Sequence, residues 1–230
     1  MEQSIYLILE NGTVFTGKAF GAVGEVTGEV VFTTSMTGYL ETLTDPSYYG
    51  QIVLQTFPLI GNYGVIPSDF ESAEPKLSAY LVREWCHDPS NFRCEGDLAA
   101  FLNASNIVGL YGIDTRRLTK IIRESGVMNA RITAKLPEDL SPVLKELAAY
   151  RITDAVGRVS CKETKEYSVE DAARRVVLWD FGAKENIARE LQKRGCHVVR
   201  MPAAATAEEI LAQKPDGVML SNGPGDPAEN

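Results

Sequence analysis

Hydrophobic and polar residues alternate through the first part of the chain, as they do in β-strands with one buried face. Residues 5–9 alternate in this way up to Asn11-Gly12, and a second run begins at 14–15. Asn-Gly between two such runs predicts a hairpin with a type I′ turn, in which both central residues have positive φ. The segments 28–34 and 51–56 predict two further strands.

Turn residues and helical spacing follow in the same half of the chain. Asp45-Pro46-Ser47 predicts a turn between the two apolar strands. A helix is expected to begin at Asp114-Thr115, where either residue can cap it, and to end at Gly126. Ser141-Pro142 opens a second helix in the order of cap and then proline. These elements predict one strand-rich domain of mixed α/β structure over residues 1–153.

The pattern changes at residue 174 to strand, helix, strand, helix and strand. The predicted elements are strand 176–179, helix 184–194, strand 197–201, a helix with a capping box at 206–209, and strand 218–220. The first and third strands are apolar throughout, as strands buried on both faces are. This order predicts the βαβαβ beginning of a doubly wound, flavodoxin-like α/β domain over 174–230. Polar residues without periodicity over 154–173 predict a linker between the two domains.

Composition narrows the function classes. The 230 residues are 44% hydrophobic and 23% charged, as in ordinary globular proteins, and the net charge of −8 argues against a nucleic-acid surface. No stretch predicts a signal peptide or a membrane span. Four cysteines, Cys86, Cys94, Cys161 and Cys196, lack CxxC spacing and are expected to be free thiols of a reducing compartment. A cytoplasmic protein is therefore expected.

The strongest candidate for chemistry is the turn at 221–227, with the sequence Ser-Asn-Gly-Pro-Gly-Asp-Pro. It lies at the carboxyl end of a predicted parallel strand, where open α/β sheets bind ligands. It lacks the Lys-Ser/Thr ending of a phosphate-binding P-loop. A dinucleotide-binding fingerprint would follow the first strand of such a unit, whereas this turn follows the third. Two interpretations stay open: a turn that binds an oxyanion or an amide, and a tight connection that needs glycine only for steric reasons.

Residues that could carry catalysis are missing from the pattern. No cysteine stands in the G-x-C-x-G spacing of a nucleophile elbow, and His87 and His197 are too isolated to indicate a metal site. Asp180-Phe181-Gly182 is interpreted as the end of a strand and its turn. The sequence therefore predicts no catalytic residue and no metal ligand among its 230 positions.

Several motifs carry a family resemblance that covers nearly the whole chain. They lie at 27–32, 34–39, 43–48, 58–64, 112–119, 179–187 and 220–227. Together they resemble the small, glutamine-hydrolysing subunit of carbamoyl-phosphate synthetase. The last two motifs resemble the opening of its class I glutamine amidotransferase domain.

The resemblance implies a glutaminase with a Cys-His-Glu triad that passes ammonia through a tunnel to a large subunit. That partner uses ATP, Mg²⁺ and bicarbonate to make carbamoyl phosphate for pyrimidine and arginine synthesis, and the small subunit itself needs no cofactor. By match of motif, Ser47, Gly223 and Gly225 fall on positions that bind L-glutamine. Gly223 would lend its N–H to the oxyanion. The first domain, 1–153, is expected to dock on the large subunit.

The resemblance also implies that the 230 residues lack the family's catalytic triad. The family's nucleophilic cysteine is expected beyond Asn230, so the chain is interpreted as truncated within its amidotransferase domain and inactive alone. The strands of 174–230 are then expected to keep an unpaired edge and an incompletely covered face. Two alternatives remain: a non-catalytic binding or structural module, and another class I amidotransferase, such as one serving GMP or anthranilate synthesis. The N-terminal motifs argue against the second.

Overall fold

The computed structural model describes residues 4–226 and 228 of the chain. It contains two compact units. Unit 1 comprises Met1–Thr44, Gly50–Phe70 and Glu74–Ile152, and unit 2 comprises Asp45–Tyr49, Glu71–Ala73 and Thr153–Asn230. Two short segments from the first half of the chain therefore belong to the second unit.

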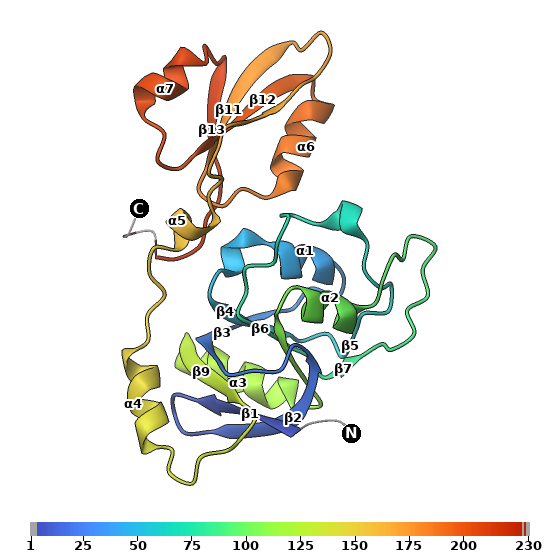
Figure 1. Ribbon diagram of the computed structural model, residues 1–230, viewed down its shortest axis with the longest axis vertical. Coiled ribbons are helices and arrows are strands. Elements are labelled where there is room, and N and C mark those ends of the chain that lie inside the picture. The colour runs from blue at the N-terminus through green and yellow to red at the C-terminus, as the bar shows by residue number, and fades with distance from the viewer. Residues whose placement is uncertain (1–3, 227, 229–230) are drawn as a thin grey trace. The chain divides into compact units, whose positions relative to one another are not determined.

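Unit 1 is built on a closed barrel, which the described residues form with seven strands in the order β1-β2-β8-β6-β4-β3-β9 (Figure 1). The strands are β1 (Ser4–Leu9), β2 (Val14–Gly21), β3 (Val26–Thr33), β4 (Gln51–Gln55), β6 (Ala79–Leu81), β8 (Val108–Tyr111) and β9 (Met128–Thr133). Neighbours from β3 through β4 and β6 to β8 are parallel, and the other pairs are antiparallel. Closure leaves the barrel without a free edge.

The first hairpin differs from its prediction in the turn and not in the pairing. β1 and β2 pair antiparallel, with Ile8 opposite Val14. Gly12 has φ +83°, but Asn11 does not have positive φ, and the Gly12 N–H donates to the Leu9 carbonyl at 2.9 Å. The predicted type I′ turn is therefore wrong. The longer loop needs only one left-handed residue, as in a type I turn followed by a glycine bulge.

The barrel core is apolar, and one helix of unit 1, α3 (Thr115–Ser125), packs its buried side chains against it. Helix α3 buries Leu118 and Ile122 against the inward-facing strand residues. Asp114 caps it by accepting the Arg117 N–H at 2.9 Å, and Gly126 follows its end with φ +79°, which confirms both predicted ends. The other elements of unit 1 are α1 (Tyr39–Thr44), η2 (Pro67–Asp69), α2 (Leu98–Ala104), α4 (Ser141–Ala149) and the short pair β5 (Leu59–Ile60) and β7 (Glu84–Trp85). None of the described helices combines the length and apolar character needed to cross a membrane.

Unit 2 contains the predicted βαβαβ order. Strands β11 (Arg174–Asp180), β12 (Cys196–Pro202) and β13 (Gly217–Leu220) are parallel, and the sheet order is β10-β12-β11-β13. Helix α6 (Glu185–Lys193) covers one face, and helix α7 (Ala207–Ala212) covers the other (Figure 1). The α7 capping box is present, with Thr206 and Glu209 in their predicted roles. Helices on both faces confirm the doubly wound arrangement.

The segment predicted as a linker, 154–173, carries structure of its own. It contains helix α5 (Ala155–Val159) and strand β10 (Lys165–Tyr167), and β10 pairs antiparallel with β12. The Cys161 N–H donates to the Asp180 carboxylate at 2.8 Å. Backbone pairing holds a three-residue edge strand in place, and such a strand packs on one side only. Its sequence is therefore too short and too polar to show the alternation that predicts a strand.

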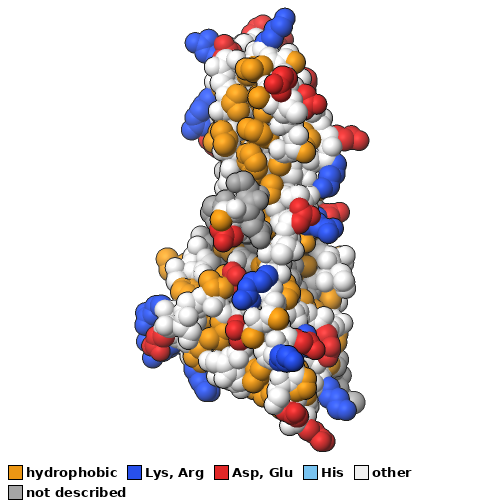
Figure 2. All heavy atoms as spheres, turned by 90° about the vertical axis from the view of Figure 1, so that its left-hand side faces the viewer, with side chains coloured by type: hydrophobic (Ala, Val, Ile, Leu, Met, Phe, Trp, Pro, Cys, Tyr) orange, Lys and Arg blue, Asp and Glu red, His pale blue; other side chains and the backbone are white. Residues whose placement is uncertain are grey.

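The prediction that β13 is buried is wrong. Val218, Met219 and Leu220 are 43%, 40% and 64% exposed, because among the described residues β13 pairs only with β11 and its faces are only partly covered. Leu211 of α7 is also 67% exposed. In the space-filling view, hydrophobic side chains gather on the surface of unit 2 (Figure 2). The expected open edge of the sheet is confirmed among the described residues, with β13 at that edge. The apolar sequence of a strand does not reveal whether a further strand or helix covers it.

Candidate functional site

The turn after β13 requires its two glycines for different reasons. Gly225 has φ +83°, in the left-handed region that favours glycine. A Cβ on Gly223 would collide with the carbonyl oxygen of Phe181. Pro224 between them is buried, while both glycines are exposed. Both positions therefore require glycine for steric reasons, and the glycine backbone is also exposed, so neither of the two interpretations of this turn is excluded. Pro227 lies outside the described residues.

Ser47 lies in η1 (Pro46–Tyr48), a short 3-10 turn that the contacts assign to unit 2. The Asp45 carboxylate accepts the Ser47 N–H at 2.9 Å. The same carboxylate pairs with the Lys184 ammonium at 2.7 Å, and its side chain is only 9% exposed. Lys184 immediately precedes α6, so this ion pair fixes the Ser47 turn to the sheet domain.

Ser47 and the glycine turn meet directly. The Asn222 side-chain amide donates to the Ser47 hydroxyl at 2.7 Å across 175 positions of sequence. The same amide lies 3.4 Å from the Gly182 carbonyl oxygen. The structure thus brings Ser47 beside the turn that holds Gly223 and Gly225. Sequence reasoning missed Asn222 and Lys184, although both stand within the quoted motifs.

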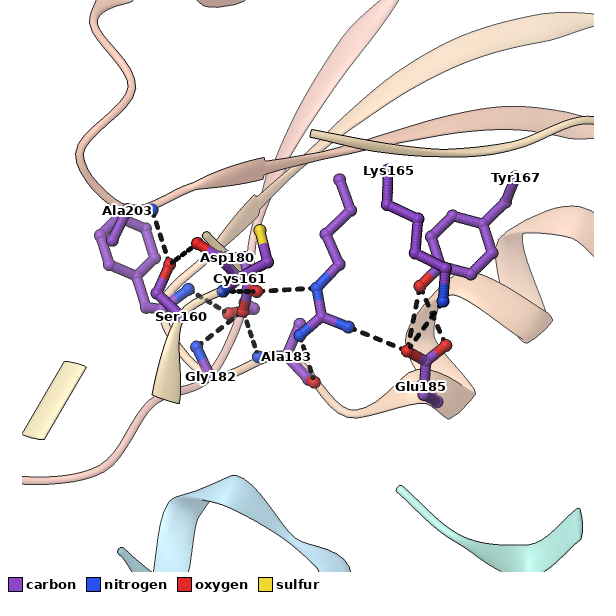
Figure 3. A network of polar contacts seen from close by, with 12 residues as sticks. Ser160, Cys161, Lys165, Tyr167, Asp180, Gly182, Ala183, Glu185 and Ala203 are labelled. Carbon is purple, nitrogen blue, oxygen red and sulfur yellow. Dashed lines mark hydrogen bonds and ion pairs between the residues drawn. The ribbon is translucent and has the colours of Figure 1, made fainter. Parts of the chain in front are cut away.

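A buried carboxylate organises the loop on which this turn rests. Asp180, at the carboxyl end of β11, is fully buried. Its carboxylate accepts the N–H groups of Gly182 and Ala183 at 2.8 and 2.6 Å and that of Cys161 at 2.8 Å (Figure 3). Burial raises the pKa of this carboxyl, but the hydrogen bonds from Arg200 and from the backbone outweigh burial and hold the pKa below its usual range.

Arg200 on β12 completes the network from the other side. Its Nε donates to Asp180 at 2.7 Å, its Nη1 donates to Glu185 at 3.0 Å, and its Nη2 lies 3.3 Å from the Ala183 carbonyl oxygen. Tyr167 of β10 donates its hydroxyl to Glu185 at 3.0 Å (Figure 3). Burial lowers the pKa of the guanidinium, but Asp180 outweighs burial and raises it, so Arg200 stays charged. The whole network lies at the carboxyl end of the parallel strands.

The Cys161 thiol is not activated as a nucleophile. All four cysteines are free, and burial, followed by the nearby Asp180 charge, raises the pKa of the Cys161 thiol to about 12. A nucleophilic cysteine needs the opposite shift, because the thiolate is the reactive form. Among the described residues no group of three or more His, Cys, Asp or Glu side chains could hold a metal ion.

Two family models match the chain, one in each half. Residues 177–230 match the family model described as "Glutamine amidotransferase class-I". Residues 7–132 match "Carbamoyl-phosphate synthase small chain, CPSase domain", a range that covers more than half of the 230 residues. The chain therefore belongs to the carbamoyl-phosphate synthase small-chain family, and the resemblance of its motifs is confirmed. This membership also excludes the alternative of an amidotransferase for GMP or anthranilate synthesis.

Curated relatives of the same family align with nearly all of the chain. It is 52% identical over 223 residues to "Carbamoyl phosphate synthase small chain" of Clostridium perfringens, and 53% identical over 223 residues to the protein of the same name from Bacillus cereus. It is 50% identical over 224 residues to "Carbamoyl phosphate synthase pyrimidine-specific small chain" of Bacillus subtilis. These alignments cover 97% of this chain and 63%, 60% and 61% of the three relatives. The chain thus spans about three fifths of the relatives' length.

A comparison with solved structures gives an aminopeptidase from Aneurinibacillus sp. strain AM-1 at a TM-score of 0.34 and 13% identity. That alignment covers 96% of this chain and 58% of the aminopeptidase. A likeness of this size has no bearing on the fold or the site.

Proposed function

We propose that this chain is part of a glutamine-hydrolysing subunit that supplies ammonia to a synthetase subunit for carbamoyl phosphate synthesis. Glutamine would bind between Ser47 and the backbone of Gly223 and Gly225. The observation that supports this most is the 2.7 Å hydrogen bond from Asn222 to Ser47, which joins the two turns within one unit. A connection that served only to link two elements would not need a partner from residue 47.

Chemically, the turn would stabilise the negative charge that develops on the glutamine amide oxygen. Gly223 is exposed, and its close approach to the Phe181 carbonyl fixes where its own backbone lies. A backbone N–H held in advance at such a position stabilises an oxyanion by roughly 3 kcal/mol in enzymes that use one. The N–H does not bond strongly to the ground-state amide, so its effect falls on the rate of the chemical step.

The partner and setting follow from the family. We propose that unit 1, which holds most of residues 1–153, docks on a large subunit that binds ATP and Mg²⁺. The carbamoyl phosphate would feed pyrimidine and arginine synthesis in the cytoplasm. The segment 174–230 would be the first part of the amidotransferase domain. The rival candidate is a binding module without catalysis, and it predicts no glutamine hydrolysis at any chain length.

The test uses a form of the protein extended to the length of its relatives and combined with its large subunit. Gly223→Val should abolish glutamine-dependent synthesis, because the side chain meets the Phe181 carbonyl. Ammonia-dependent synthesis should remain within about twofold of the parent, since that reaction does not use the turn. Gly217→Val is the matched control, because an added Cβ at Gly217 meets no atom within 4 Å. Equal activity of the two variants with glutamine would reject the proposed site.

A further inference from the structure

We infer that Arg200 is a positioning residue for the glycine turn, acting through Asp180 and the backbone of residues 181–183. The inference rests on the proposed function only for its effect on glutamine hydrolysis. Its structural half can be tested on the 230-residue chain. Arg200 stands on β12, a different strand from the one that leads into the turn, so no local sequence pattern reveals the connection.

The first step of the argument is that Asp180 and Arg200 hold the two peptide groups on either side of the Ala183 Cα. Asp180 accepts the Ala183 N–H at 2.6 Å, and Arg200 reaches the Ala183 carbonyl at 3.3 Å. Asp180 also accepts the Gly182 N–H at 2.8 Å. Both residues are buried, at 0% and 9% exposure, so a donor or acceptor left unpaired among them is costly. The loop at 181–183 is therefore held by the charge pair.

The second step is that this loop supports the glycine turn along its length. The Phe181 N–H donates to the Ser221 hydroxyl at 2.9 Å, and the Phe181 carbonyl lies where a Gly223 side chain would be. A Cβ added to Gly182 would lie 3.0 Å from the Pro224 ring. A shift of the loop at 181–183 must therefore move the Gly223 backbone, because the two are in van der Waals contact.

The third step is that the geometry requires arginine in particular. The guanidinium uses Nε, Nη1 and Nη2 toward three different acceptors, Asp180, Glu185 and Ala183. A lysine ammonium is one point of charge and cannot reach three separated acceptors from a fixed position. Lysine would keep the charge that holds Asp180 ionised and lose the contact with the Ala183 carbonyl. The two substitutions Arg200→Lys and Arg200→Met thus separate charge from geometry.

The structural test records backbone N–H spectra of the 230-residue chain. Arg200→Met should shift the resonances of Gly182, Ala183 and Gly223, while those of the Arg175 end of the sheet stay in place. Arg175→Met is the matched control, since Arg175 bonds Gln213 at 3.1 Å at the amino end of β11. It should shift its own neighbours and leave the glycine turn unchanged. Unchanged Gly223 signals in a folded Arg200→Met protein would overturn the inference.

The functional test uses the extended protein with its large subunit. Arg200→Met should lower kcat for glutamine about 10- to 100-fold with little change in KM, because misplacing an oxyanion donor affects the transition state most. It should also move the acid limb of the pH profile to higher pH, because Asp180 loses its cationic partner. Arg200→Lys should keep the parent pH profile, and its kcat should fall less than that of Arg200→Met. If Arg200→Met does not fold, Arg200→Lys is the variant used for the test.

Two outcomes separate this inference from the proposed function. An extended parent protein without glutaminase activity rejects the proposed function and leaves the spectral test to decide the structural claim. An active parent whose Arg200→Met variant keeps its kcat within about threefold, with the same pH profile, rejects the positioning role. An equal loss in Arg175→Met would reject it as well, since that variant disturbs the sheet without touching the loop.

Discussion

Removing the Asp180 carboxylate should destabilise unit 2 far more than removing any exposed carboxylate of the same sheet. Asp180→Ala leaves Arg200 charged and buried without its main partner, and it leaves the N–H groups of Gly182, Ala183 and Cys161 without an acceptor. Breaking a buried pair by removing one partner costs about 3–5 kcal/mol. With a urea dependence of about 1–2 kcal/mol/M, the midpoint of unit 2 should fall by roughly 1.5 M or more.

The chain carries an internal reporter for each unit, because its two tryptophans are Trp85 in unit 1 and Trp179 in unit 2. Trp85→Phe leaves Trp179, on β11 next to Asp180, as the fluorescent probe of unit 2. Trp179→Phe leaves the probe of unit 1, whose midpoint should not change. If unit 2 of the variant is unfolded without urea, trimethylamine N-oxide restores a measurable transition.

Asp216→Ala is the matched control for this measurement. Asp216 is exposed, and its carboxylate accepts one backbone N–H, that of Arg175, at 2.8 Å. Its loss should cost about 1 kcal/mol. Asp180→Asn should cost nearly as much as the alanine variant, because its amide group would face the donors of Cys161 and Arg200. A loss below about 1.5 kcal/mol in Asp180→Ala would mean that water or relaxation satisfies these groups, contrary to our reasoning.

Three further predictions concern pH, activity and exchange. Because the pKa of Asp180 is depressed in the folded protein, its contribution to stability is complete above its unfolded value, near 4, and is lost as the pH falls below that value and through the folded pKa; urea midpoints of unit 2 should therefore drop below about pH 4, and the drop should be smaller in Asp180→Asn, where Glu190, whose pKa is lowered by Arg194 and Lys193, still contributes. The 230-residue chain should release ammonia from glutamine only at background rate, since none of its cysteines stands in the G-x-C-x-G spacing of a nucleophile elbow; ammonia release above background that persists after all four cysteines are replaced by serine would refute the prediction. Hydrogen exchange should be slow in the barrel and fast over Gly217–Leu220, because that strand pairs on one side only and its side chains are exposed; uniformly slow exchange in a dilute monomer would contradict this.

Hydrophobic periodicity predicted the elements well where each one packs by a regular stripe. The helices after Asp114 and Thr206 begin at their capping residues, and the sheet of unit 2 has helices on both faces. Closure of the seven barrel strands described in unit 1 could not be predicted. It depends on which distant strands pair, such as β1 with β9, and both would show the same alternation in an open sheet.

The two errors in unit 2 have a common physical origin. Strand β10 was missed because Lys165 and Glu166 are exposed, and an edge strand needs only backbone pairing to one neighbour. Strand β13 was predicted as buried because Val218, Met219 and Leu220 are apolar, although they are exposed here. In both cases the residue types show only which environments a strand is compatible with. Its actual burial depends on the neighbouring elements that pair with it and pack on it.

The candidate site shows the same limit at the level of single contacts. Residue types predicted that the turn at 221–227 would need glycine, and the structure gives the reason in the Phe181 carbonyl beside Gly223. They could not predict that Ser47 meets Asn222, because that contact joins an element of the first half of the chain to one 175 positions away. Asp45 makes the meeting possible, since its buried carboxylate is shared between the Ser47 N–H and the Lys184 ammonium. In the glutamine site that we propose, the positions of both turns therefore depend on residues that would not touch the substrate. These are the carboxylates of Asp45 and Asp180, which fix the backbone around Ser47 and around residues 181–183.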